Sequence, residues 1–420
     1  MSRTFASLRK HRNYRLFFSG QLVSVFGTWM QMIALAWFVA DQTRSPLAVG
    51  ILAFCRFLPF TLFGLVAGVL ADRFDNRRLV ITTQAAAMAV SVALSVLALT
   101  GATPLWAIYL LAALGGTATV FDAPGRQSLT FQLVGRDELP NAVALNATLF
   151  NASRMLGPAV AGLVIAAGGT AACFIINAFS FLAVLAALAL IRTSELYPVE
   201  RGDSRPTVFR GAREGLAYAK RTRVVWLVLV ITTVLSTFGF NFNVLVPVLV
   251  RETLNAGPEV FGALSAAFGA GALAGALLTA TMGRASWKAL LAGTGGFGLV
   301  VLVLAPQTSV PVAGVLLFVA GVCFILWNSN TQSLLQLTAP DHLRGRVMSL
   351  FLFAFAGLGP LGALAAGSLA DAGGTQLAFV VAGLAGISMA VLGWWKSPFR
   401  EHAPRPGSAR LEPGVVHRPE

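Results

Sequence analysis

The sequence predicts an all-α membrane protein of about twelve transmembrane helices, arranged as two related six-helix bundles. Composition is the first indication, because 56% of the 420 residues are hydrophobic and 11% are charged, whereas soluble domains carry about a quarter charged residues. A series of long apolar runs is the second indication, and motifs that recur in the second half are the third. Membrane barrels are excluded, because their strands alternate apolar and polar residues and runs such as 105–120 and 178–191 are apolar on all sides.

Apolar stretches able to cross a membrane, each about 20 helical residues long, follow one another along the chain. In the first half we expect spans at 14–40, 47–71, 79–100, 104–130, 141–167 and 171–192. In the second half we expect spans at 223–250, 258–282, 288–306, 310–337, 346–370 and 375–396. The first span is too long for a removable signal peptide and lacks a small-residue cleavage site.

These spans divide the chain into five parts. A cytoplasmic N-terminus at 1–13 precedes the first bundle at 14–192, and a disordered cytoplasmic tail at 397–420 follows the second bundle at 223–396. A cytoplasmic linker at 193–222 separates the two bundles, because charged residues and prolines interrupt the apolar pattern there.

Positively charged residues fall almost entirely on one side of the predicted membrane. The formal net charge is +14, and the loops and span ends on the side of both termini hold 26 of the 31 Lys and Arg residues. The opposite loops hold Arg44 and Arg251, while Arg56, Arg126 and Arg154 lie within spans. Because cytoplasmic loops carry the excess of Lys and Arg, both termini are expected in the cytoplasm. The expected partners of these charges are anionic lipid headgroups and not nucleic acid.

Short motifs of the first half recur in the second half, in the same order and at offsets of 202 to 212 residues. The matching pairs are Ser45-Pro46-Leu-Ala-Val-Gly50 with Gly257-Pro258-Glu-Val-Phe-Gly262, Gln127-Ser128-Leu129 with Gln332-Ser333-Leu334, Asp137-Glu-Leu139 with Asp341-His-Leu343, and Gly157-Pro158 with Gly359-Pro360. Such a duplication is typical of secondary transporters, in which two repeats enclose a binding site.

Further motifs carry a resemblance to a known family. They are Gly68-Val-Leu-Ala-Asp72-Arg73-Phe-Asp-Asn-Arg77-Arg78 between spans 2 and 3, Phe26-Gly-Thr-Trp-Met-Gln31, Phe121-Asp-Ala-Pro-Gly-Arg-Gln127, Leu139-Pro-Asn-Ala142 and Asn151-Ala-Ser-Arg154-Met-Leu-Gly-Pro158. With these, the chain resembles the major facilitator superfamily, in its drug and siderophore exporter branch. The resemblance implies the major facilitator fold and a transporter of the bacterial inner membrane. Such a protein exports a small organic molecule by alternating access in exchange for protons.

Two motifs depart from the family pattern, namely the signature between spans 2 and 3 and the arginine motif of span 4. Asp75 stands where the signature between spans 2 and 3 usually has glycine, and the second copy of that signature is reduced to Gly283-Arg284. The arginine motif of span 4 is missing, because residues 110–116 contain no arginine. Proton coupling therefore rests on the family likeness alone.

The resemblance also implies a gate at the cytoplasmic ends of the spans. Asp72 would contact the start of span 11, where the partial positive charge of a helix N-terminus attracts a carboxylate. The expected gating residues are Gly68, Asp72, Arg73, Arg77, Arg78, Arg344 and Arg346. The alternative is that these charges only set the topology.

Three charges inside spans need an explanation, because a charge at the bilayer centre costs about 2.5–3.5 kcal/mol on insertion scales. Arg56 and Arg154 either line a cavity and favour anionic or polar neutral substrates, or bond to neighbouring helices. Asp122 can reach Arg126 one helical turn away. The pair is either a proton-coupling site or a static ion pair.

Uncharged polar and aromatic residues cluster in spans 1, 7 and 10. Apolar walls with a few amide groups suit drug-sized ligands, although hydrogen bonds between helices would explain each residue equally well. The candidates for the substrate cavity, besides Arg56 and Arg154, are Gln21, Thr28, Gln31, Asn241, Asn243, Trp327, Asn328 and Asn330. In span 5, the stretch with Gly157, Pro158 and Gly162 resembles the motif of exporters that exchange substrate for protons.

Enzymatic chemistry is not predicted. All four histidines fall in tails or loops, the three cysteines lie singly in different spans, and no phosphate-binding or metal-binding spacing occurs. We therefore expect no cofactor and no metal, an ion gradient of protons as the energy source, a small-molecule substrate and a monomeric unit. A proton-coupled importer, or a membrane receptor on the same scaffold, is the alternative.

Overall fold

The computed structural model describes residues 5–101, 103–198, 208–282 and 285–397. Side chains at 65–66, 68–73, 208–212 and 342 are not described, so for Gly68, Asp72 and Arg73 only the helical backbone is available. The predicted disordered tail at 397–420 lies almost wholly outside the described residues.

Helices make up nearly all of the described chain. Those of the first half are α1 (Ala6–Lys10), α2 (Arg12–Thr43), α3 (Pro46–Arg73), α4 (Asn76–Thr100) and α5 (Leu105–Ala189). After a short 3₁₀ turn at Thr193–Glu195, the linker ends in α6 (Val208–Arg221). The second half contains α7 (Arg223–Val234), α8 (Phe242–Val248), α9 (Pro258–Met282), α10 (Trp287–Leu304), α11 (Val310–Thr338), α12 (Asp341–Leu352) and α13 (Gly359–Trp395), with π-helical turns at Leu235–Gly239, Leu249–Thr253 and Phe353–Gly357.

Nine described helical stretches are long and apolar enough to cross a membrane. Seven of them hold one crossing each. The stretch α5 turns back at Gly135 and Gly169, whose φ angles of 71° and 73° are left-handed, and therefore holds three crossings. The stretch Leu343–Trp395 turns at Gly373 and Gly374 and holds two. The described chain thus makes twelve crossings, which confirms the predicted fold.

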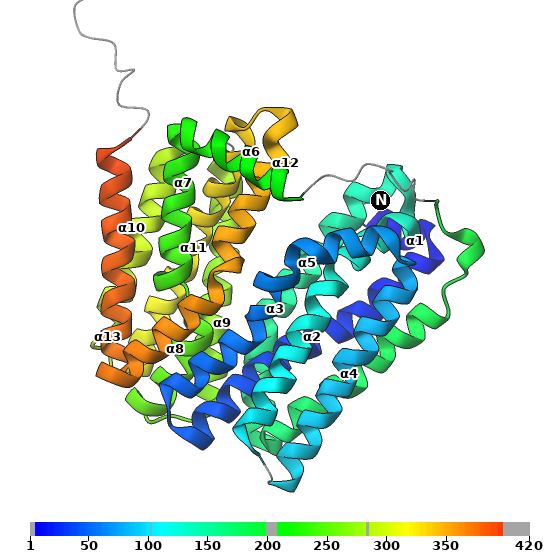
Figure 1. The fold of residues 1–420 in the computed structure, drawn as a ribbon. Helices are drawn as coiled ribbons and strands as arrows, with labels where there is room; N and C mark the ends of the chain where they lie inside the picture. The colour runs from blue at the N-terminus through cyan, green and yellow to red at the C-terminus, as the bar shows by residue number, and fades with distance from the viewer. Residues whose placement is uncertain (1–4, 102, 199–207, 283–284, 398–420) are drawn as a thin grey trace, which may run out of the picture.

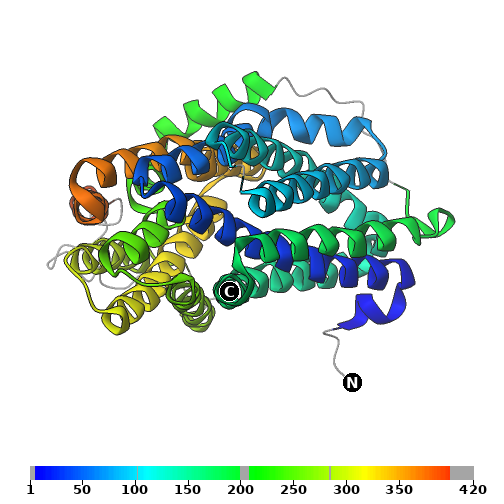
Figure 2. The ribbon, with the colours of Figure 1, turned by 90° about the horizontal axis from the view of Figure 1, so that it is seen from below.

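The two halves form separate groups of helices that meet at one end. In Figure 1 they converge at the lower end and diverge at the upper end, where α1, α6 and α12 lie. Seen from below, the first half (blue to teal) and the second half (yellow to orange) lie side by side (Figure 2). We call the upper end, which carries α6, the linker end, and the lower end the closed end.

Two glycine-to-glycine crossings join the halves near the closed end. A Cβ on Gly50 of α3 would lie 3.0 Å from Cα of Gly367 in α13, and a Cβ on Gly162 of α5 would lie 2.9 Å from Cα of Gly262 in α9. The internal repeat relates them, since Gly50 corresponds to Gly262 at an offset of 212 and Gly162 to Gly367 at an offset of 205. Small residues are needed here because membrane helices associate through close packing of their backbones.

Polar contacts close the same end. Arg251 Nε lies 2.9 Å from Asp41 Oδ1 and pairs the end of the first crossing with that of the seventh. This ion pair is close in distance but poorly aligned, because Arg251 Nε makes no hydrogen bond within the described residues. Ser45 Oγ donates to Asp371 Oδ1 at 3.3 Å, which adds a second bridge between the halves.

The linker helix packs on the second half. Tyr218 of α6 donates to the carbonyl of Thr338 at 3.0 Å, and Arg346 of α12 pairs with Glu214 of α6. Figure 1 shows α6 and α12 side by side at the linker end. The linker therefore holds the start of the eleventh crossing on the second half.

Adding a methyl group at one glycine crossing should open the closed end. In Gly262→Ala the new Cβ would lie 2.8 Å from Cα of Gly162, a backbone atom that cannot move aside. Overpacking costs about 1–3 kcal/mol, a factor of roughly 5 to 150 in population. Distance distributions between spin labels on Gln42 and Ala256, which both border the closed end, should gain a longer component.

Gly314→Ala is the matched control, because its new Cβ would meet only Cδ2 of Leu264 at 3.5 Å, an ordinary contact. It should leave the distance distribution unchanged. An unchanged distribution in Gly262→Ala would contradict the role of the crossing.

Candidate functional site

A cavity of about 650 Å³ lies between the halves. The middle segment of α5 forms one wall, and α9 and α11 form the other. A second cavity of about 890 Å³ adjoins it along α9 and α11 and extends to Arg344 at the start of α12. Both volumes fall in the range of pockets that hold drug-sized ligands. The polar residues that line the first cavity are Thr148, Asn151, Arg154, Asn328, Ser329, Gln332, Ser333 and Gln336.

Only some of the predicted cavity residues reach these spaces. Arg154 and Asn328 line the first cavity, and Asn330 borders the second. Arg56 and Asn243 face each other across a narrow, mostly apolar space between α2, α3 and α8. The structure therefore brings five of the ten candidates to a cavity wall, in two different places.

The other five candidates pack between helices. Gln31 is buried and accepts a hydrogen bond from Asn177 Nδ2 at 2.8 Å, which joins the first and sixth crossings. Thr28 and Asn241 each bond to a backbone carbonyl of their own helix turn at 2.8 Å. Gln21 and Trp327 are 2% and 1% exposed. The described residues thus give these five side chains contacts inside the bundles and not with a cavity.

Several polar residues of the cavity lining were not predicted from the sequence, namely Thr148, Asn151, Ser329, Ser333 and Gln336. Asn328, Gln332 and Gln336 are spaced by four residues on α11, and Ser329 and Ser333 follow the same spacing. Residues at this spacing share one face of a helix. The four-residue spacing of the polar residues in span 10 was the feature of the sequence from which this lining could have been predicted.

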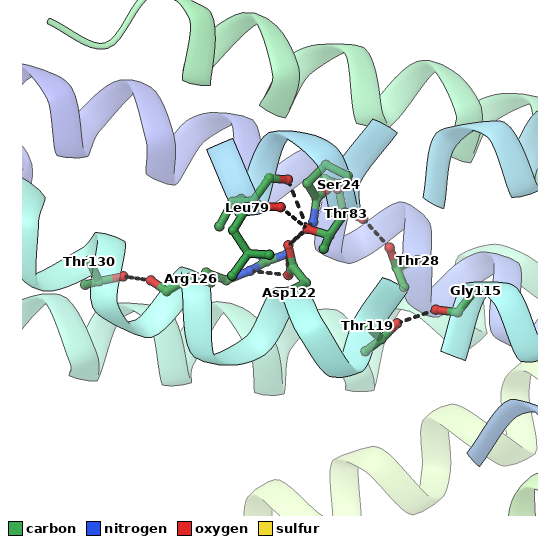
Figure 3. Close-up of polar contacts among 11 residues, drawn as sticks. Ser24, Thr28, Leu79, Thr83, Gly115, Thr119, Asp122, Arg126 and Thr130 are labelled. Carbon is green, nitrogen blue, oxygen red and sulfur yellow. Dashed lines mark hydrogen bonds and ion pairs between the residues drawn. The ribbon is translucent and has the colours of Figure 1, made fainter. Parts of the chain in front are cut away.

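Asp122 lies at the centre of a buried polar network (Figure 3). Its Oδ1 is 2.9 Å from Thr83 Oγ1 and accepts from Gln84 Nε2 at 2.8 Å, both on α4. Its Oδ2 accepts from Arg126 Nε at 2.8 Å and also contacts Nη2 of the same guanidinium. Ser24 of α2 extends the network, donating to Gln84 Oε1 at 3.3 Å.

All members of this network belong to the first half. A rocking motion of the two halves as rigid bodies would leave every one of these contacts in place. Because Arg126 lies one turn from Asp122 on the same helix, rotation of its side chain is enough to uncover Oδ2. Separation of Arg126 from Asp122 therefore requires a change inside the first half.

The predicted gating residues make contacts within their own half or with the linker. Arg77 donates from Nε to the carbonyl of Leu188 at 2.8 Å, at the end of the sixth crossing. Arg344 pairs with Asp341 at 2.6 Å, and Arg346 pairs with Glu214. Arg78 is exposed. The side chains of Asp72 and Arg73 lie outside the described residues, so their contacts with these arginines are not observed.

Asp75 has a local role that explains the departure from the family pattern. It precedes α4, and its side chain accepts a hydrogen bond from the backbone N–H of Arg78 at 2.8 Å. An aspartate at this position satisfies one of the free N–H groups at a helix start. Asp75, which stands where the family pattern has glycine, therefore caps the start of the third crossing.

The span 5 motif is a packing surface. A Cβ on Gly157 would lie 2.8 Å from Cβ of Trp29 in α2, so only glycine fits beneath that side chain. Pro158 presents its carbonyl to Gly262, and Gly162 forms the crossing described above. The motif thus sets the distance of the fifth crossing from the first and from the eighth.

The comparison with known proteins agrees with this architecture. The family model described as transmembrane secretion effector matches residues 2–412. The chain belongs to this family of the major facilitator superfamily. It is therefore a multi-pass membrane transporter and not an enzyme.

Curated relatives align with the transporter over almost its whole length. Macrolide efflux protein A of Streptococcus pyogenes is 24% identical over 394 residues, which cover 92% of this chain and 97% of that protein. The staphyloferrin A transporter of Staphylococcus aureus (strain NCTC 8325 / PS 47) is 26% identical over 385 residues, covering 90% and 94%. A solved structure, the nucleoside transporter NupG, superimposes with a TM-score of 0.72 at 13% identity, covering 95% of this chain and 100% of that one. The last similarity concerns the fold alone.

Breaking the buried pair in this transporter should destabilise the first half. Arg126→Gln leaves the Asp122 carboxylate without its charged partner, and the loss should be about 3 kcal/mol. The melting temperature in detergent should fall accordingly. The double variant Asp122→Asn with Arg126→Gln removes both charges and should recover most of the loss, whereas additive losses would contradict the pairing.

Proposed function

We propose that this transporter exports a small organic molecule from a bacterial cytoplasm by alternating access, in exchange for protons. The observation that carries the proposal is the polar cavity between two halves that converge at one end and diverge at the other. A cavity in this position is accessible from the linker end in the present conformation. Rocking of the halves about the site would open it to the other side.

The direction rests on orientation and on the relatives. The side that carries both termini and the linker holds 26 of the 31 Lys and Arg residues, so we place the linker end in the cytoplasm of a cell with the protein in its inner membrane. Substrate would then load from the cytoplasm. One relative is an efflux protein for macrolides and another is a staphyloferrin A transporter, which favours export over uptake. Anionic lipid headgroups would contact the basic loops, and a single chain supplies both halves.

Protons are the proposed counter-ion, and no cofactor is required. Asp122 is the one acidic side chain that is buried among the described residues, and its neighbour Arg126 supplies the exchange partner. In the proposed step a proton binds Oδ2 of Asp122 as the Arg126 guanidinium turns away. Release of that proton to the cytoplasm lets Arg126 return.

A flux measurement tests the function. Purified protein in liposomes with an imposed pH gradient and a lumenal pH dye would be offered labelled macrolides, tetracyclines, catecholate siderophores and cationic dyes. We expect at least one compound to move against the direction of proton movement. Movement in the same direction as protons would instead establish an importer, and no flux by folded protein would contradict transport of these compound classes.

Asp122→Asn should separate proton coupling from transport. An asparagine side chain keeps the hydrogen bonds from Thr83 and Gln84 but cannot take up a proton. We expect gradient-driven flux to be abolished while exchange of labelled for unlabelled substrate continues. Loss of exchange as well, in protein that melts normally, would assign Asp122 a structural role.

Asp72→Asn should test the gate. A carboxylate that contacts the start of the eleventh crossing in one state biases the conformational equilibrium, and coupling of this kind is worth about fivefold or more in rate. We expect transport to slow by that factor with the amount of folded protein in the membrane little changed. Equal losses in both would show that Asp72 serves only insertion.

A further inference from the structure

The second half presents an aromatic wall at the interface of the halves. Phe240 and Phe324 stack with ring centroids 4.2 Å apart. Phe268 lies 5.8 Å and Phe355 lies 6.4 Å from the same Phe324 ring. Phe324 is buried, whereas Phe240, Phe268 and Phe355 are half-buried. None of these four rings lines either of the two cavities, and the cluster forms the ring face against which Arg154 packs.

Arg154 of the first half faces this cluster. Its guanidinium carbon lies 5.9 Å from the centre of the Phe324 ring, within reach of a cation–π interaction. Within the described residues this ring is the one partner that the guanidinium has, and no carboxylate contacts it. A guanidinium carries five N–H donors. A carboxylate would accept hydrogen bonds from them, whereas the ring face leaves these donors available to a ligand.

Several other arginines have acidic partners, whereas Arg56, like Arg154, has none among the described residues. Arg126 contacts Asp122, Arg251 contacts Asp41, Arg344 contacts Asp341 and Arg346 contacts Glu214. Arg154 is also the one charged residue that lines the 650 Å³ cavity in the described part of the chain. The cavity wall is thus positive with no compensating carboxylate.

The internal repeat relates a member of the aromatic cluster to a cation of the first half. Gly116 packs against the carbonyl of Arg56, and Gly321 packs against the carbonyl of Phe268. The two contacts are equivalent, since Gly116 and Gly321 are 205 residues apart and Arg56 and Phe268 are 212 residues apart. At the position where the second half has Phe268, a member of the aromatic cluster, the first half therefore has Arg56, a second cation.

A polar donor lies across the same cavity from Arg154. Gln332 donates from Nε2 to Asn328 Oδ1 at 2.9 Å. With its oxygen occupied, Asn328 keeps its N–H donors for a ligand. Cation and amide donors together suit a negatively charged oxygen and disfavour an ammonium group.

From these contacts we infer that the transported molecule is an organic anion. This inference rests on the proposed function and names its substrate class. A carboxylate head binds the Arg154 guanidinium across from Asn328, and the apolar body lies against Met155, Leu273 and Ile325, which line the same cavity. A cation of the same shape meets an uncompensated positive charge and binds weakly.

Three dansyl compounds with one aromatic body and different head charges test the inference. They are dansylglycine (carboxylate), its amide (neutral) and N-(2-aminoethyl)dansylamide (ammonium), and each is titrated into the full chain in non-ionic detergent while dansyl fluorescence is recorded. Dansylglycine should bind about tenfold or more tightly than the amide, because hydrogen bonds to a charged group are the stronger ones. The ammonium compound should bind most weakly.

Arg154→Gln should reduce the preference for dansylglycine over the amide to about twofold or less, with affinity for the amide itself unchanged. Arg154→Lys keeps the charge and should retain part of the preference. Arg136→Gln removes an exposed charge outside both cavities and should retain all of it.

Several outcomes would overturn the inference. They are failure of dansylglycine to bind, equal or tighter binding of the ammonium compound, or an unchanged preference in Arg154→Gln. The comparison of the three compounds on the unaltered protein needs no variant to fold. Binding of dansylglycine without flux in liposomes would overturn the proposed export and leave the anion site standing. Preferential flux of the ammonium compound would overturn the anion site and leave the proposed export standing.

Discussion

The two glycine crossings at the closed end hold the halves of this transporter together. In a membrane, lipid is as apolar as the helices, so helices associate only where their backbones can approach closely. Gly50 with Gly367, and Gly162 with Gly262, supply that approach on opposite sides of the interface. Toward the linker end the halves diverge (Figure 1), and the cavity lies between them.

The duplicated halves share their backbone contacts and differ in the chemistry that they present to each other. Equivalent glycines pack against the carbonyls of Arg56 and Phe268, so the helices cross in the same way in both halves. One side chain is a cation and the other is part of an aromatic cluster. Symmetry therefore preserved the geometry of helix packing, while the ligand chemistry diverged.

The ion pairs differ in whether a movement of the two halves relative to each other would break them. Asp122 and Arg126 lie inside the first half and keep their contacts when the halves rock. Arg346 is held by Glu214 of the linker, and Asp41 meets Arg251 across the closed end. The last pair must separate if the closed end opens, because its two members belong to different halves.

The twelve crossings and their boundaries follow from the sequence, because a backbone in lipid must satisfy its hydrogen bonds within a helix. The predicted span at 258–282 coincides with α9 (Pro258–Met282). The site was only partly predictable. Gln31 and Asn328 are both amides within apolar spans, yet one bonds to Asn177 between helices and the other lines the cavity.

Composition and hydropathy thus determined that this chain crosses a membrane twelve times in two related halves. Tertiary structure alone decided which polar residues meet a ligand, because that depends on the rotation of each helix about its axis and on the neighbour it faces. The pair of Asp41 with Arg251 joins residues 210 positions apart. No local spacing encodes such a contact, since packing between the halves brings its two members together.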